Sequence, residues 1–133
     1  MNGFNLLKKN NLTSYLNALA EAEPYDDGDC VCLDIENGSA DITLMYIKPM
    51  LLPGQDDIGN LIKALIELDY HVACRESSKS YYLETGYEFT LSYVEIETID
   101  SLTLYYAGIN VNTLWGAEFN KDETGQWLFG GLC

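Results

Sequence analysis

The sequence predicts an α+β fold in which two helices pack on one face of a mainly antiparallel sheet, in the order α-β-β-α-β-β-β-β(-β). Three observations carry this prediction. Two segments have apolar residues every three or four positions, an Asn-Gly dipeptide separates two apolar runs, and apolar and polar residues alternate through most of the second half. At 133 residues, we expect a single domain spanning residues 1–133.

Both helices are indicated by a one-sided apolar stripe. In the first, the stripe residues follow the i, i+3, i+4, i+7 pattern: Leu12, Tyr15, Leu16 and Leu19. Asn10 or Asn11 can cap this helix, and Pro24 with the acidic turn after it ends it. The second helix has Asp56 or Asp57 as its cap. Its stripe residues are Ile58, Leu61, Ile62, Leu65 and Leu68.

Strands are predicted on both sides of the second helix. Asp29–Glu36 and Asp41–Ile47 form a hairpin, because the Asn37-Gly38 dipeptide between them suits a tight type I′ turn. After the second helix, Tyr70–Glu76 and Tyr81–Glu84 are expected to be strands that flank a short polar turn.

The next strand changes phase in its middle. One face first takes odd-numbered residues, Tyr87, Phe89, Leu91 and Tyr93, and then even-numbered ones, Val94 and Ile96. A shift of one residue would turn the apolar set away from the core, so we expect a β-bulge near Ser92–Val94. Tyr87 and Tyr93 are then expected in the core.

The remaining residues predict the closing strands. The alternation continues through a series of apolar positions: Leu102, Leu104, Tyr106, Ile109, Val111, Thr113 and Trp115. Tyr105 and Tyr106 face opposite sides of their strand, so at most one of them can lie in the core. In the last hairpin, Trp115, Ala117 and Phe119 are expected to pair with Trp127 and Phe129.

Charge is the strongest compositional signal. The chain has 21 acidic and 7 basic residues, a net charge of −14. No basic residue lies between Lys9 and Lys48 or between Lys79 and Lys121, and both stretches contain several acids. Nucleic acids and anionic membranes bind through lysine and arginine, so direct contact with either is excluded as the main function.

Few residues suit catalysis. His71 is the only histidine and Arg75 the only arginine, so nucleophilic triads and phosphate clamps have little support. If Tyr70–Glu76 is a strand, Cys74 lies on the opposite face from His71, which disfavours a Cys–His dyad. The acidic segment at residues 26–38 lacks the EF-hand spacing, which leaves only a weak cation site as an alternative. We expect no cofactor.

The cysteines are expected to be reduced thiols without a metal. The N-terminal segment does not have the pattern of a secretory signal, and no apolar run is long enough to span a membrane. A cytoplasmic location follows as an expectation, and thiols remain reduced there. The spacing of Cys30, Cys32, Cys74 and Cys133 matches no common zinc finger.

The C-terminal segment YYAGINVNTLWGAEFNKDETGQWLFGG carries a resemblance. It is similar to the closing strands of small bacterial proteins grouped with the immunity proteins of polymorphic toxin systems. The resemblance covers about a fifth of the chain and rests on a tryptophan-containing hairpin. It implies a cytosolic, non-catalytic inhibitor that binds a toxin domain.

Together these observations predict a non-enzymatic acidic protein that inhibits a basic, nucleic-acid-handling protein: a toxin nuclease, a restriction enzyme or a CRISPR effector. An acidic surface would imitate the charge field of nucleic acid and speed association with such a partner. Two patches are the candidate partner-binding residues. We expect Asp26, Asp27 and Asp29 at the end of the first helix, and Glu95, Glu97 and Asp100 at the turn after the bulge. The alternatives are a small carboxylate- or metal-dependent hydrolase and a housekeeping domain whose acidity serves solubility.

Overall fold

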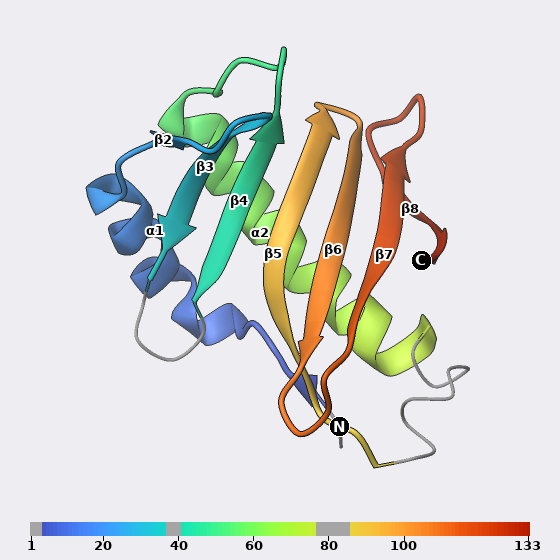
Figure 1. The fold of residues 1–133 in the computed structure, drawn as a ribbon. Coiled ribbons are helices and arrows are strands. Elements are labelled where there is room, and N and C mark those ends of the chain that lie inside the picture. The colour runs from blue at the N-terminus through green and yellow to red at the C-terminus, as the bar shows by residue number, and fades with distance from the viewer. Residues whose placement is uncertain (1–3, 37–40, 77–85) are drawn as a thin grey trace.

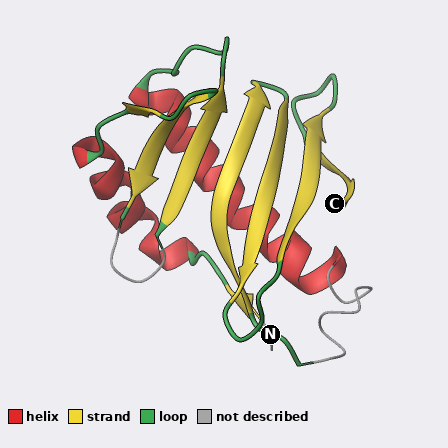
Figure 2. Cartoon of the chain, in the orientation of Figure 1, coloured by secondary structure: helices red, strands yellow, loops and turns green. Residues whose placement is uncertain are grey.

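The sheet dominates the structure. A computed structural model describes residues 4–36, 41–76 and 86–133 (Figure 1). Its strands are β1 (Phe4–Asn5), β2 (Tyr25–Asp26), β3 (Cys30–Ile35), β4 (Ile42–Ile47), β5 (Phe89–Thr98), β6 (Ser101–Gly108), β7 (Leu114–Lys121) and β8 (Trp127–Leu132). They form an eight-stranded sheet in the order β2-β3-β4-β5-β6-β7-β8, with β1 paired to β5. Both α-helices cover the same face, which confirms the predicted α+β architecture (Figure 2).

The first helix, α1 (Leu12–Glu21), follows a short 3₁₀ turn, η1 (Lys9–Asn11), and buries Tyr15 and Leu19. Asn11 occupies its N-cap position without a side-chain hydrogen bond to the helix. The second helix, α2 (Gln55–His71), has Gly54 at its N-cap position, so the predicted caps Asp56 and Asp57 lie inside its first turn instead. No helix in the described residues has the length and hydropathy that crossing a membrane requires.

The prediction that Tyr70–Glu76 is a strand is wrong. Helix α2 runs to His71 and continues as a π-helical turn, η2 (Val72–Glu76). Val72 lies four residues after Leu68, so it prolongs the buried helical stripe, and it is fully buried. The few apolar residues of this segment cannot distinguish the helical period from strand alternation. The expected strand Tyr81–Glu84 and the Asn37-Gly38 turn lie outside the described residues.

Helix α2 connects two parallel neighbours, β4 and β5, in the middle of the sheet. Strand β1 is also parallel to β5 and pairs with its start, at Phe4 and Phe89, whereas β4 pairs with its later part, at Thr43 and Tyr93. The other neighbouring strands are antiparallel, including the predicted hairpin of β3 and β4.

The predicted bulge is confirmed. Leu91 pairs with Tyr106 and Tyr93 pairs with Tyr105, so Ser92 is an extra residue in β5. Val94 and Ile96 consequently return to the buried face. The bulge precedes Tyr93, however, and turns it to the open face of the sheet. There its ring stacks on that of Tyr105 with centroids 4.7 Å apart, so the prediction that Tyr93 is a core residue is wrong.

Residues 109–113 form a loop between β6 and β7, although their alternation predicted a strand. The loop turns back on Gly108, where a Cβ atom would lie 2.0 Å from the carbonyl oxygen of Val111. The last hairpin forms as predicted, and Phe119 pairs with Phe129 in β7 and β8. The other partners differ from the prediction, because Ala117 pairs with Leu132 and Trp127 with Lys121.

The core lies between the helices and the sheet and contains one buried carboxylate among the described residues, Asp69. One oxygen of Asp69 accepts a hydrogen bond from the backbone N–H of Leu7 at 2.7 Å, and the other accepts one from the Tyr106 hydroxyl at 2.7 Å. Burial raises the pKa of Asp69 to about 6, while these two bonds oppose the rise. Asp69 thereby holds the N-terminal segment against α2 and β6.

Candidate binding surface at one end of the sheet

The strand directions bring four connections to the same end of the molecule. Strands β4 and β5 are parallel and both end there, and β3 begins there because it is antiparallel to β4. The β2–β3 turn, the loop from β4 to α2, the β5–β6 turn and the β7–β8 turn therefore lie at one end (Figure 1). We call this the acidic end. Its acidic residues are Asp26, Asp27, Asp29, Asp56, Asp57, Glu97, Asp100, Asp122 and Glu123.

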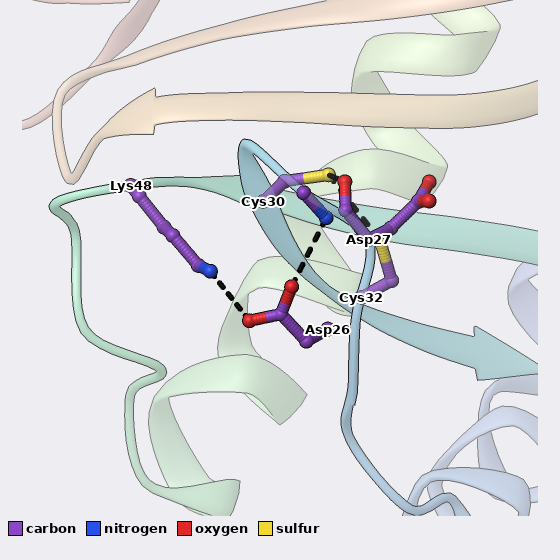
Figure 3. Close-up of polar contacts among 6 residues, drawn as sticks. Asp26, Asp27, Cys30, Cys32 and Lys48 are labelled. Carbon is purple, nitrogen blue, oxygen red and sulfur yellow. Dashed lines mark hydrogen bonds and ion pairs between the residues drawn. The ribbon is translucent and has the colours of Figure 1, made fainter.

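The first predicted patch lies at this end, but in the β2–β3 hairpin and not directly after α1. Asp26 is partly neutralised, because its carboxylate forms an ion pair with Lys48 and accepts a hydrogen bond from the N–H of Gly28 at 3.0 Å (Figure 3). The Lys48 ammonium and the Gly28 N–H lower the pKa of Asp26. Asp27 and Asp29 are exposed, and unlike Asp26 neither forms an ion pair among the described residues.

The second predicted patch is divided between two surfaces. Glu97 and Asp100 are exposed at the end of β5 and in the β5–β6 turn, so they join Asp27 and Asp29 at the acidic end. Glu95 was expected in this turn, but it lies within β5 and pairs with Thr103. It is half-buried on the open face beside the stacked tyrosines. Burial, together with the charge of Glu95, raises the pKa of Tyr93.

The remaining acids of this end belong to neither predicted patch. Asp56 and Asp57 reach the acidic end because α2 starts there, and Asp122 and Glu123 reach it through the β7–β8 turn. Asp122 is already engaged: its carboxylate accepts bonds from the N–H and hydroxyl of Thr124 and the N–H of Gln126, which lower its pKa. The sequence shows that all four residues are acidic. It does not show that they lie at the same end of the molecule, because that depends on the order of the strands in the sheet.

Two apolar side chains are prominent among these acids. Leu51, in the loop from β4 to α2, is 85 % exposed, and Ile99, in the β5–β6 turn, is 71 % exposed. These are the two highest values among the exposed large hydrophobic residues in the described parts of the chain. Exposed apolar groups rimmed by polar residues are a feature of protein interfaces.

A groove of about 540 Å³ opens beside Ile99, between α2 and the sheet. Apolar side chains supply much of its wall, including Met50, Leu61, Ile99 and Trp127. Its polar lining includes Tyr46, Asp57, Asn60 and Lys121. The Lys121 ammonium lies 5.0 Å from the centre of the Trp127 ring, a cation–π distance.

Two cysteine thiols lie in β3, directly after the aspartates of the first patch. Cys30 and Cys32 occupy alternate positions of β3, and their sulfur atoms are 3.4 Å apart (Figure 3). The Asp27 carboxylate and both sulfurs lie within 4.8 Å of one another, so three potential metal ligands converge. Burial and the neighbouring thiol raise the pKa of Cys32 to about 12, which favours the protonated thiol over the thiolate that a metal needs.

His71 lies at the C-terminal end of α2, opposite the acidic end. Its Nε2 atom is 2.9 Å from a carboxylate oxygen of Glu76, and its ring packs near those of Phe119 and Phe129. His71 therefore packs at the end of α2 between Glu76 of η2 and the two phenylalanines of the last hairpin.

Comparison of the chain with protein-family models, curated proteins and solved structures gives no match.

Proposed function

We propose that this chain is a non-enzymatic binding protein that docks on a basic, nucleic-acid-handling protein through its acidic end and inhibits it. The observation that supports the proposal best is the position of Leu51 and Ile99 among the acidic turns. These exposed apolar side chains would be buried in a complex, and the surrounding carboxylates would meet lysine and arginine side chains.

The carboxylates and the exposed apolar side chains have different physical roles in binding. Carboxylates at the rim accelerate encounter with a positive partner and lose this effect as salt screens them. Each exposed ion pair contributes little alone, about 0.2–1 kcal/mol, so the acids must act together. Apolar anchors at the centre contribute most of the binding energy once water is excluded. Acidity that served only solubility would give no reason for the most exposed apolar residues to lie among the acids.

The partner class follows from this charge. Proteins that cleave or bind nucleic acid carry basic channels, and a toxin nuclease, a restriction enzyme and a CRISPR effector all meet this description. The acids at this end come from separate turns and a helix start, not from one regular row. They would reproduce the negative field of a nucleic acid without copying its phosphate spacing.

The test compares variants of equal net charge. The protein is used to capture a partner from the cells that produce it, and the purified pair is then titrated at several salt concentrations. The variant Asp29→Lys/Glu97→Lys/Asp100→Lys should weaken binding about tenfold or more and flatten its salt dependence. The control Glu36→Lys/Glu67→Lys/Glu88→Lys changes exposed acids away from this end.

A third variant, Leu51→Ser/Ile99→Ser, keeps every charge. It should increase the dissociation rate while leaving the salt dependence of association unchanged. Equal losses in the two charge-reversal variants would show that only net charge matters and would contradict the proposal. So would a captured partner that is acidic, or that keeps its activity when bound.

A further inference from the structure

The groove beside Ile99 combines apolar walls with polar groups that the protein leaves unused. Tyr46 lines it and is 1 % exposed, and its buried hydroxyl has no hydrogen-bond partner among the residues that the structure describes. A buried hydroxyl is nearly always paired, because leaving it unpaired costs the desolvation of the group. This exception lies in the wall of a cavity large enough for a small organic molecule.

The acceptor groups near Tyr46 favour a cationic ligand. Asp57 lies close enough that its negative charge adds to the effect of burial in raising the pKa of Tyr46. No hydrogen bond or ion pair satisfies the Asp57 carboxylate within the described residues, and the side chain of Asn60 adds an amide oxygen. A carboxylate, a phenolic oxygen and an amide oxygen can each accept a hydrogen bond from an ammonium group.

The charge around the groove is mostly negative, which also favours a cationic ligand. Asp56 lies in the first helical turn of α2, and Asp100 and Asp122 lie in the β5–β6 and β7–β8 connections. Lys121 is the one cation among the described residues that line the groove. The Lys121 ammonium is held over the Trp127 ring. It therefore occupies an aromatic face that a ligand could also pack against.

We propose that this groove binds a small organic cation, a primary ammonium group carried on an apolar body. The ammonium group would donate hydrogen bonds to Asp57 and Tyr46, and the apolar body would pack against Leu61, Ile96 and Trp127. This site does not depend on the protein-binding role of the acidic end. A free amine of this size would fill it without any partner protein.

The test uses two probes of nearly equal shape, phenethylammonium and the neutral 2-phenylethanol. Each is titrated into isotopically labelled protein while backbone amide shifts are followed by NMR. Phenethylammonium should shift the amides of residues that line the groove and should bind at least about fivefold more tightly than the alcohol. Binding should weaken as salt is added. Equal affinity of the two probes, or shifts centred elsewhere, would overturn the proposal.

Four variants make the test specific. Asp57→Asn should weaken phenethylammonium binding about five- to tenfold, because it removes the charged acceptor. Asp56→Asn removes the same charge one residue away, outside the groove lining, and should change the affinity less than about twofold. Tyr46→Phe should weaken binding about two- to fivefold. Lys121→Met should strengthen it, because it removes a positive charge from the groove lining and frees the Trp127 ring for the apolar body of the ligand.

Two of these variants should weaken phenethylammonium binding and Lys121→Met should strengthen it, so general damage to the fold cannot reproduce the whole set. The amide spectrum of each free variant shows whether it is folded. If Asp57→Asn and Asp56→Asn weaken binding equally, or if Lys121→Met also weakens it, the groove does not hold an ammonium group in this way.

Discussion

The hydroxyl of Tyr106 donates a 2.7 Å hydrogen bond to the carboxylate of Asp69, and both side chains are completely buried. This pair joins the middle of the sheet to the last turns of α2. The second carboxylate oxygen holds the backbone of Leu7, so one side chain connects three separate parts of the chain.

Asp69 should make stability depend on pH. Its pKa rises from 3.8 when unfolded to about 6 when folded, so the folded protein binds the additional proton between these values. The stabilisation is complete below pH 3.8 and is lost as the pH rises through 6. From about pH 5 to about pH 7.5 the free energy of unfolding should fall by about 1–1.5 kcal/mol through this group.

Urea unfolding followed by tryptophan fluorescence at the two pH values measures this change. Asp69→Asn cannot titrate, so its free energy of unfolding should change less over the same interval. The general repulsion among surface acids remains in both proteins, and the difference between them isolates Asp69. An identical pH dependence in both would rule out this assignment.

The two buried tyrosines Tyr106 and Tyr46 should respond oppositely to loss of the hydroxyl group. Tyr106→Phe removes a donor to a buried carboxylate and should lower the free energy of unfolding by about 1.5–3 kcal/mol at neutral pH. Tyr46→Phe removes a hydroxyl that has no protein partner in the described structure. It should be neutral or stabilising by up to about 1 kcal/mol. Urea titrations compare the two, and a large loss in Tyr46→Phe would reveal a partner for its hydroxyl.

Gly108 should tolerate no side chain. A Cβ atom at this position would lie 2.0 Å from the carbonyl oxygen of Val111, so Gly108→Ala should force the β6–β7 loop to move and cost at least about 2 kcal/mol. At Gly130 the nearest atom to an added Cβ would be the side-chain nitrogen of Asn120, 3.4 Å away. Gly130→Ala is the matched control and should change the melting temperature little. Equal melting temperatures for both variants would contradict the close approach at Gly108.

The four thiols should differ in reactivity. Cys133 is exposed, whereas Cys30 and Cys32 are buried, and none of the four forms a disulfide. A thiol reagent at about pH 8 should therefore modify Cys133 before Cys30 and Cys32, and Cys133→Ser should remove this early phase. Native mass spectrometry should find no bound zinc. One zinc ion per chain that disappears in Cys30→Ser would show instead that the thiol pair and Asp27 form a metal site.

The sequence predicted those features that depend on local periodicity. The stripes of α1 and α2, the last hairpin and the bulge at Ser92 follow from the spacing of apolar residues. The pairing of β3 with β4 follows from the Asn-Gly dipeptide between them. The segment at Tyr70–Glu76 was misassigned because its few apolar residues fit both periods. Strand β6 ends at Gly108, where the following loop turns back and brings the carbonyl oxygen of Val111 close to the glycine. The alternation of apolar residues does not predict this contact.

The candidate surface could be predicted only in part. Asp27, Asp29, Glu97 and Asp100 were identified by charge, and they converge because β4 and β5 are parallel neighbours. That relationship joins segments on either side of α2 and has no local signal. Glu95 was grouped with the turn because the length of β5 could not be judged. The proposed role of Leu51 rests on the exposure of its side chain, which apolar character alone would not suggest.

The attachment of the N-terminal segment also determines when the fold can be completed during synthesis. The N–H of Leu7 and its acceptor Asp69 are 62 residues apart, a separation that takes a ribosome roughly 3–12 s to translate. The pairing of β1 is delayed further, because its partner in β5, Phe89, is synthesised after Asp69. Until those residues leave the ribosome, Phe4 and Leu7 have no native place to be buried. The part of this chain that is made early is therefore among the last to be ordered.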